Sequence, residues 1–238
     1  IVLSFGPNFS TLAILDHQGV QQDWRMNPGF NIEMARKTFF NVNHEEAFER
    51  FQNINFRHAG TGLGGHTEYF KRATIDASYG HITAINYNPA NNLLPFLADE
   101  RDVQVNLTFR PTARLKLDEV YYYTNLRTRT ATVFVNHLAR SRLNYQFTRE
   151  LSLRLIMDYN GVLENPALVN LTRQKRVTGD VLMTYLIHPG TALYIGYTDR
   201  LENLRLFPGA PPTVGPIGFP STTTARQFFA KVSYLFRF

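Results

Sequence analysis

The glycine-rich segment GTGLGG, Gly60 to Gly65, has residue types that suggest ligand chemistry. A phosphate-binding loop places such glycines between a strand and the N-terminus of a helix, where backbone N–H groups surround the anion. Here the segment runs on into HTEYFKR, which continues as a strand pattern. Glycines inside a strand more often admit a bulky neighbour or allow a bend. We therefore expect a structural role for this segment.

The histidines are scattered, and two groups of them stand near carboxylates. His44 to Glu46 is one group, and His58 and His66 with Glu68 form the other. A metal site needs nitrogen and oxygen ligands that converge on one point and are themselves held by hydrogen bonds. Nothing in the spacing indicates such convergence. We expect these side chains to line the rim or the lumen of a β-barrel, a fold that the strand pattern indicates. No metal and no other cofactor are expected.

Catalytic residues are not indicated either. A hydrolase needs a nucleophile such as serine, held by a base and an orienting group. Ser141 and His137 share a strand face, but it is the apolar face, which is the wrong side for a polar substrate. The chain is therefore not expected to be an enzyme, and an outer-membrane hydrolase remains the second alternative function.

Composition narrows the class of protein. The 238 residues include 19 Phe and 12 Tyr, and only 18% are charged, which favours strands over helices. Without cysteine the chain has no disulfides. The net charge of +6 is dispersed, so no nucleic-acid partner is expected. No stretch approaches the roughly 20 apolar residues of a membrane-spanning helix.

Apolar and polar residues alternate with a period of two along most of the chain. The pattern is clearest in VQVNLTFR, ARSRLNYQF, LSLRLIMDYN and VTGDVLMTYLI. Such alternation predicts strands with one apolar and one polar face. About twelve strands are expected, near 5–16, 20–34, 37–48, 59–70, 73–86, 102–110, 113–126, 132–147, 150–162, 175–187, 191–203 and 225–238.

The connections alternate between short polar turns and longer segments. The longer ones are expected near 49–58, 87–101, 127–132, 163–175 and 204–224. Many strands also reach the 9 to 11 residues that a tilted strand needs to cross a bilayer. These features predict an all-β fold, an antiparallel up-and-down transmembrane β-barrel. We expect one domain over 1–238 that is the C-terminal part of a longer protein, and its wall is either complete or completed by upstream strands.

The C-terminal stretch RQFFAKVSYLFRF supports this interpretation. Its alternation resembles the assembly signal of bacterial outer-membrane barrels, which places a phenylalanine last. If the short turns lie on the periplasmic side, the 204–224 segment lies at the outer side of the membrane. There it could be a mobile external loop, fold inward as a plug, or bind an N-terminal domain. The residues assigned to the signal are Phe228, Val232, Tyr234, Phe236 and Phe238.

The alternative is a soluble barrel or sandwich, whose strands also alternate. Strand length, the asymmetry of the connections and the terminal Phe favour the membrane. The polar face then lines the lumen, either as ion pairs that stiffen the wall or as a field that favours anions. Glu119 falls on the apolar face of its strand. We expect a β-bulge that re-aims it, and contact with another subunit or an added domain is the alternative. The expected lumen-lining residues are Arg110, Lys116, Asp118, Arg140, Arg142, Arg154, Asp158, Arg176 and Asp180.

Several stretches resemble one bacterial family. RPTARLKLDEVYYYTNLRTR, SRLNYQFTRELSLRLIMDYN, HPGTALYIGYTDR and the final thirteen residues resemble its C-terminal region, and GHITAINYNPANNLLPFLADE fits as well. Members of that family combine an N-terminal domain like carbohydrate-binding family nine with an outer-membrane β-barrel domain of unknown function. The resemblance implies a location more firmly than an activity, and it carries over no catalytic residues.

These expectations combine into one function. We expect a barrel in the outer membrane of Gram-negative bacteria that anchors or supports a glycan-handling or surface assembly, with passive transport as a further role. An anion-biased, porin-like solute channel is the alternative. The expected partners are the lipid bilayer, the outer-membrane assembly machinery, and an N-terminal glycan-binding domain or another protein of the cell envelope.

Overall fold

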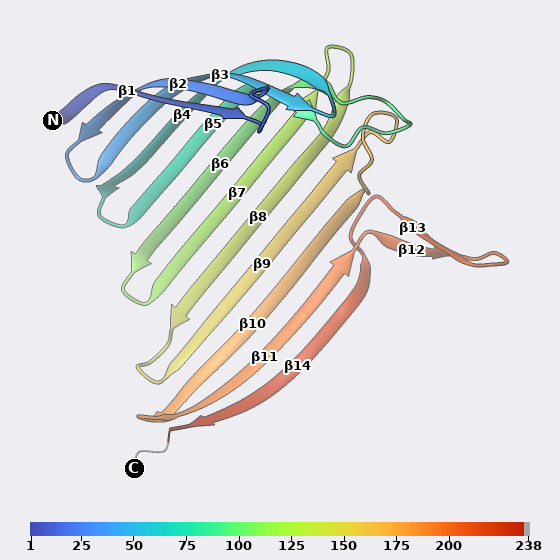
Figure 1. Ribbon diagram of the computed structural model, residues 1–238. Helices are drawn as coiled ribbons and strands as arrows, with labels where there is room; N and C mark the ends of the chain where they lie inside the picture. Colours follow the sequence, from blue (N-terminus) through green and yellow to red (C-terminus); the bar gives the residue numbers. More distant parts are fainter. Residues whose placement is uncertain (236–238) are drawn as a thin grey trace. The chain divides into compact units, whose positions relative to one another are not determined.

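A computed structural model describes residues 1–235 of the chain as an almost purely β structure (Figure 1). Twelve antiparallel strands follow one another in a single sheet, in the order β1 to β11 and then β14. The expected all-β, up-and-down arrangement of twelve strands is thus confirmed. No helix in the described part of the chain is long and apolar enough to cross a membrane. The strands of the sheet are β1 (Val2–Leu15), β2 (Gln21–Met34), β3 (Thr38–Phe51), β4 (Ile54–Phe70), β5 (Ala73–Asn86), β6 (Phe96–Thr112), β7 (Leu115–Arg127), β8 (Thr132–Gln146), β9 (Leu151–Glu164), β10 (Gln174–His188), β11 (Thr191–Glu202) and β14 (Thr222–Tyr234).

Tight turns join the strands where the backbone can adopt a positive φ. Between β2 and β3, Arg36 and Lys37 have φ values of 60° and 49°. Between β3 and β4, Gln52 and Asn53 have φ values of 50° and 62°, which suits a two-residue hairpin turn. The expected long segment at 49–58 was therefore wrong, because both strands continue to this turn.

The turn between β1 and β2 is fixed by one carboxylate. Asp16 Oδ1 accepts hydrogen bonds from the backbone N–H groups of Val20, at 2.8 Å, and Gln18, at 2.9 Å. Hydrogen bonding to Val20 is the main cause that lowers the pKa of Asp16 below its ordinary value. Gly19 completes the turn with a φ of 77°.

The described residues form two compact units. Unit 1 comprises residues 1–106, 122–136 and 163–172, and unit 2 comprises residues 107–121, 137–162 and the described residues from 173 onward. Unit 1 contains a small apolar cluster of Ala98, Leu126, Val133 and Val169. In this cluster the connection between β9 and β10 packs against strands.

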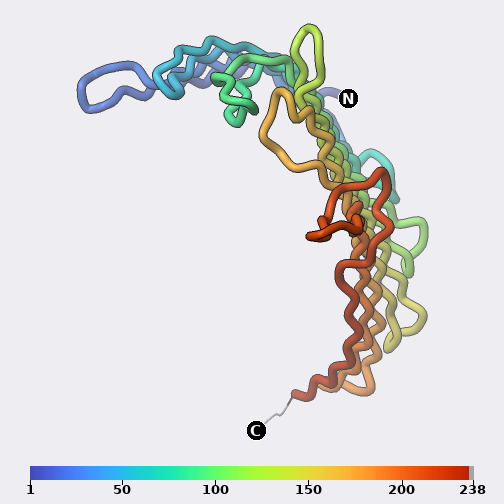
Figure 2. The backbone as a smooth tube through the Cα atoms, turned by 90° about the vertical axis from the view of Figure 1, so that its right-hand side faces the viewer, coloured from blue at the N-terminus to red at the C-terminus, as the bar shows by residue number. Residues whose placement is uncertain are grey.

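Two of the connections in unit 1 are joined by side-chain amides. Asn86 Nδ2 donates to the carbonyl of Leu168 at 3.0 Å, and Asn88 Nδ2 donates to that of Asn170 at 2.7 Å. Figure 2 shows the β5–β6 connection, in green, and the β9–β10 connection, in orange, turned to the same side of their strands. The β9–β10 connection is thus held down on unit 1.

In unit 2, the segment between β11 and β14 forms a hairpin of its own, β12 (Leu204–Phe207) and β13 (Thr213–Pro216). Two short paired strands thus lie within the long connection expected at 204–224. Asn203, which is 1% exposed, closes the base of the hairpin. Its side chain accepts from the backbone N–H of Lys175 at 2.7 Å and donates to the carbonyl of Ile217 at 3.1 Å.

The sheet begins with β1 and ends with β14, and each of these strands has one neighbouring strand among residues 1–235. Both are long, with 14 and 13 residues. The free edge of such a strand presents unpaired backbone N–H and C=O groups.

Candidate functional site: a polar sheet face

The nine residues predicted to line a lumen lie in unit 2 and share one face of its strands. Cross-strand partners point to the same side of a sheet, and Asp158 faces Thr178 while Asp180 faces Thr198. Arg140 bonds to Asp158 across the strands, through Nη2 to Oδ2 at 3.2 Å and through a shorter Nε–Oδ1 bond. Both residues therefore belong to this polar face.

Several charges on this face of unit 2 are in ion pairs. Lys116 Nζ lies 2.8 Å from Asp118, and Arg176 Nε lies 3.0 Å from Glu202. The hydroxyl of Thr198 donates a hydrogen bond to Asp180. These contacts form the ladder of ion pairs that the sequence suggested, and each pair contributes little alone because the side chains are partly exposed.

Three predicted arginines have no ion pair within the described chain. Arg110 and Arg154 are exposed, and Arg142 has a buried Nε without a hydrogen-bond partner. Arg200 and Lys231 lie on the same face by register. Basic side chains therefore outnumber acidic ones on the polar face of unit 2.

The polar face of unit 1 has the opposite character, which the sequence reasoning missed. The register of β1 to β5, continued into β6, places mostly acidic residues there. The signal was present in alternations such as GFNIEM, where Asn31 and Glu33 separate apolar residues. The charged residues of this face are Asp23, Arg25, Glu33, Glu45, Glu49, Asp76, Glu100 and Asp102.

Asparagine amides cover glycines on the same face of unit 1. A Cβ added to Gly62 would lie 2.6 Å from Asn43 Oδ1, and one added to Gly29 would lie 2.5 Å from Asn8 Oδ1. Asn41 covers Gly64 in the same way. The glycines of GTGLGG thus admit neighbouring side chains, as expected, and β4 runs through the segment without the helix that a phosphate loop requires.

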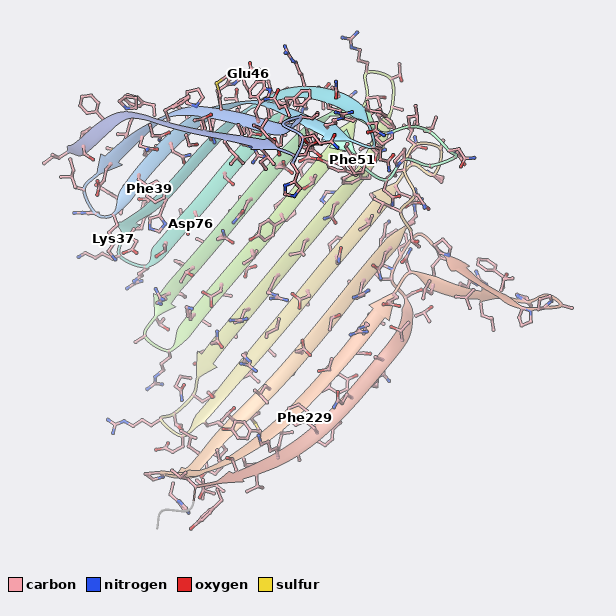
Figure 3. All side chains as sticks on the ribbon, in the orientation of Figure 1. Lys37, Phe39, Glu46, Phe51, Asp76 and Phe229 are labelled. Carbon is pink, nitrogen blue, oxygen red and sulfur yellow. The ribbon has the colours of Figure 1, made fainter. Side chains whose placement is uncertain are left out.

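An aromatic ring stands at the short-connection end of this face. The rings of Phe39 and His66 are stacked, with centroids 5.5 Å apart and an interplanar angle of 18°. His66 Nδ1 lies 2.6 Å from Asp76 Oδ1, which fixes the imidazole. Figure 3 shows Phe39, Asp76 and Lys37 near the short connections of β2–β3 and β4–β5.

Two hollows adjoin Phe39. The larger, of about 980 Å³, includes Ser4, Asn31, Glu33 and Asn41 in its lining. The smaller, of about 200 Å³, has a lining that includes Asn41, Asp76, Ser78, Gln104 and Asn106. Both hollows thus combine polar side chains with the exposed ring of Phe39, and the lining of the larger one also includes Phe5, Pro7 and Ile32.

The β9–β10 connection covers part of the polar face of unit 1, at the end away from the short connections. The alternation along β5 and β6 places Ala84, Asn86 and Ala98 on the polar face. The connection packs against them through Leu168 and Val169. A hollow of about 450 Å³ remains beside this contact. The sequence reasoning did not anticipate that the connection at 165–173 packs on this face.

The opposite face is apolar and exposed. In unit 2 it carries Met157, Val181, Phe228 and Val232, with exposures of 62%, 40%, 69% and 67%. In unit 1 it carries Phe30, Phe40 and other large apolar residues that are also exposed. Soluble monomers rarely expose apolar patches larger than a few hundred Å².

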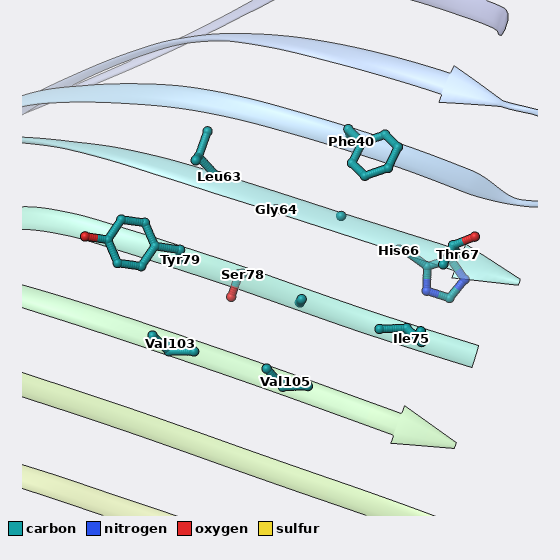
Figure 4. A pocket seen from close by; sticks show the side chains of 12 residues that line it. Phe40, Leu63, Gly64, His66, Thr67, Ile75, Ser78, Tyr79, Val103 and Val105 are labelled. Carbon is teal, nitrogen blue, oxygen red and sulfur yellow. The ribbon is translucent and has the colours of Figure 1, made fainter. Parts of the chain in front are cut away.

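A shallow apolar pocket of about 510 Å³ lies on this face of unit 1 (Figure 4). Its floor is low because Gly65 and Ala77 face each other across β4 and β5. The larger side chains around it are Phe40, Leu63, Ile75, Tyr79, Val103 and Val105.

The apolar band occupies the half of each strand next to the short connections. In unit 1 it ends at a row that includes His44 and Thr61, which are hydrogen-bonded at 3.0 Å. In unit 2, Asp199 and Arg226 form a 3.0 Å ion pair at the level of Met157, and Tyr197 donates to Asp199. Polar groups thus mark the outer limit of the band.

Glu119 remains on the apolar face of β7, so the bulge expected to re-aim it was wrong. Its Oε1 accepts a 2.7 Å hydrogen bond from the hydroxyl of Ser141, which lies on that face of β8. Tyr121 and His137 form a second polar contact there, at 2.9 Å. A direct hydrogen bond partly satisfies the carboxylate, and Ser141 is engaged with it and not with His137.

The histidines do not converge on a metal-binding geometry. His44 and Glu46 share a face, but Glu45 points to the other side. Within residues 1–235, no group of three or more His, Asp or Glu side chains could hold a metal ion.

The proposed assembly signal is described in part. Phe228, Val232 and Tyr234 lie on one face of β14 and are exposed, in agreement with the predicted alternation. Phe236 and Phe238 lie outside the described residues. The role of the segment as an assembly signal stays a prediction.

Comparisons with known proteins identify no family for this chain. No family model matches the chain, and no curated protein sequence matches it. A solved structure of a KdgM porin in complex with disordered oligogalacturonate aligns with 98% of this chain and 100% of its own, at 9% identity and a TM-score of 0.32. Such a score carries no functional conclusion, which must come from this chain's own residues.

Proposed function

We propose that the chain forms the wall of a porin-like β-barrel in the outer membrane of Gram-negative bacteria. The apolar face contacts the lipid bilayer, and the polar face lines a water-filled lumen. The exposed apolar band carries this proposal, because twelve strands of 12 to 17 residues present it beside the short connections. The assembly machinery of the outer membrane is the partner that inserts such a barrel.

Closure of the wall follows from the same physics. In hydrocarbon, every backbone polar group needs a hydrogen-bond partner, so a free strand edge is not tolerated. Strands β1 and β14 must therefore pair with each other or with further strands of a longer protein.

The lumen is proposed to be weakly selective among ions. Basic residues prevail on the polar face of unit 2, and acidic residues prevail on that of unit 1. A wall that carries both signs in near balance gives no strong preference for anions or cations. The hypothesis of an anion-biased channel rests on Arg140 and Arg142 and therefore on the charges of unit 2 alone.

A second proposal is that the barrel anchors a glycan-handling domain or another envelope protein. The β12–β13 hairpin favours it, because its base is fixed by Asn203 while Leu206, Val214 and Phe219 are exposed at 62%, 64% and 80%. Apolar side chains held in this way offer a contact surface to a partner. The family resemblance to carbohydrate-binding-associated barrels suggests the kind of partner.

Planar-bilayer recordings of the refolded chain test the proposal. We expect stepwise conductance and a reversal potential close to zero in a salt gradient. A folded, membrane-inserted protein that passes no current would reject the channel and leave the anchor. A protein that stays soluble and folded in the absence of lipid and detergent would reject both.

A further inference from the structure

We propose that the polar face around Phe39 in unit 1 is a binding site for a neutral oligosaccharide. The proposal deepens the proposed function and rests on it, since it assigns a solute class to the lumen face. The site comprises Phe39, Ser4, Asn31, Glu33, Asn41 and Asn106, which line the two hollows beside β3.

Phe39 provides the apolar platform. Its side chain is on the polar face, yet the residue is 47% exposed. His66 holds the ring by stacking, and Asp76 holds His66, so the platform is fixed without a ligand. A pyranose ring has an apolar face of C–H groups that packs on such an exposed aromatic, while its hydroxyls need polar neighbours.

The polar neighbours are free amides. Within the part of the chain that the structure describes, the side chains of Asn31, Asn41 and Asn106 make no hydrogen bond to other residues. Each carboxamide offers two donors and two acceptor lone pairs, which suits hydroxyl groups that donate and accept. Gly64 brings Asn41 close to the sheet, so its amide forms part of the floor beside the ring.

The charges at the site favour a neutral ligand. Lys37 Nζ pairs with Glu68 at 3.0 Å, and Asp76 pairs with His66. Glu33 accepts a 3.0 Å hydrogen bond from Ser4 Oγ. An anionic sugar would meet these carboxylates unfavourably, and a cationic one would find most of them engaged.

The size of the hollows fits a short oligosaccharide. Small-molecule sites usually measure about 300 to 1,000 Å³, and the larger hollow of about 980 Å³ falls within this range. It opens at the short-connection end of the strands, which is the periplasmic mouth in the proposed orientation.

Titration calorimetry of the full chain, refolded in a detergent without a sugar head group, tests the site. The probes are maltohexaose, cellohexaose and xylohexaose as neutral ligands, a glucosamine hexamer as a cation and hexagalacturonate as an anion. We expect at least one neutral probe to bind with a Kd of about a millimolar or tighter, with little dependence on salt. Binding of no neutral probe, or tighter salt-sensitive binding of a charged one, would overturn the proposal.

A matched pair of variants assigns the binding to the face. Phe39→Ala removes the platform, and we expect affinity to fall about tenfold. Phe40→Ala deletes the same side chain one residue later, on the apolar face, and should leave affinity unchanged. Asn41→Ser, a milder change, should weaken binding several-fold. Equal effects of the two Phe variants would place the ligand elsewhere.

Bilayer recordings separate this inference from the proposed function. If the chain conducts but neutral sugars neither bind nor block the current, the channel stands and the site is wrong. If neutral sugars bind but no current flows, the site stands and the channel is wrong.

Discussion

Replacing Met183 by arginine tests which medium surrounds the apolar face. Met183 is 37% exposed, and its cross-strand neighbours are Leu153 and Ile195. It lies between the short connections and the Asp199–Arg226 ion pair that limits the apolar band. The next residue, Thr184, points to the polar face beside Ser152 and provides the control.

The expected loss of folding free energy depends on how deep residue 183 lies in the bilayer. An arginine on the lipid face of a β-barrel costs about 2 to 4 kcal/mol at the midplane. This cost corresponds to a loss of about 30-fold to 700-fold in the folding equilibrium constant. Thr184→Arg enters the aqueous lumen and is expected to stay within about 0.5 kcal/mol of the wild type.

Equilibrium unfolding in urea, measured by tryptophan fluorescence in lipid vesicles, gives both free energies. Heat-modifiable mobility on gels confirms that each variant starts from the folded barrel. Equal destabilisation by Met183→Arg and Thr184→Arg would refute the assignment of this face to lipid. A larger loss for Thr184→Arg would place the polar face in the protein interior.

Two further predictions concern individual side chains. A double-mutant cycle with Arg140→Ala and Asp158→Ala should give a coupling free energy of about 0.2 to 1 kcal/mol, because the pair is half exposed; absence of coupling would remove it from the ladder. Burial, followed by the hydrogen bond to Glu49, raises the pKa of Tyr87 to about 12 from 10.0. The unfolded chain loses this proton first, so the contribution of Tyr87 to stability is present below pH 10 and lost toward about pH 12. Unfolding free energies of the wild type and Tyr87→Phe should diverge over that interval, and parallel pH profiles would contradict the shift.

Alternation alone was enough to predict the strands of unit 2. In β9 and β10, leucine and valine alternate with arginine, aspartate and threonine, so the two faces differ sharply. The placement of Arg140 beside Asp158 followed from this contrast.

Unit 1 was harder to interpret for physical reasons. Glycine and asparagine occupy the polar positions of β4 and β3, and their short side chains make alternation weak. The inward packing of the β9–β10 connection depends on Asn86, which is 82 residues away from Leu168 in the sequence. Local patterns carry no information about a contact over that separation.

The anchoring of Asn203 has a practical consequence for engineering. Its contacts to Lys175 and Ile217 close the base of the β12–β13 hairpin independently of the residues at the tip. A foreign epitope inserted between Phe207 and Thr213 would therefore be presented from a fixed stem, without altering the register of β11 and β14. The chain is in this respect a ready scaffold for peptide display.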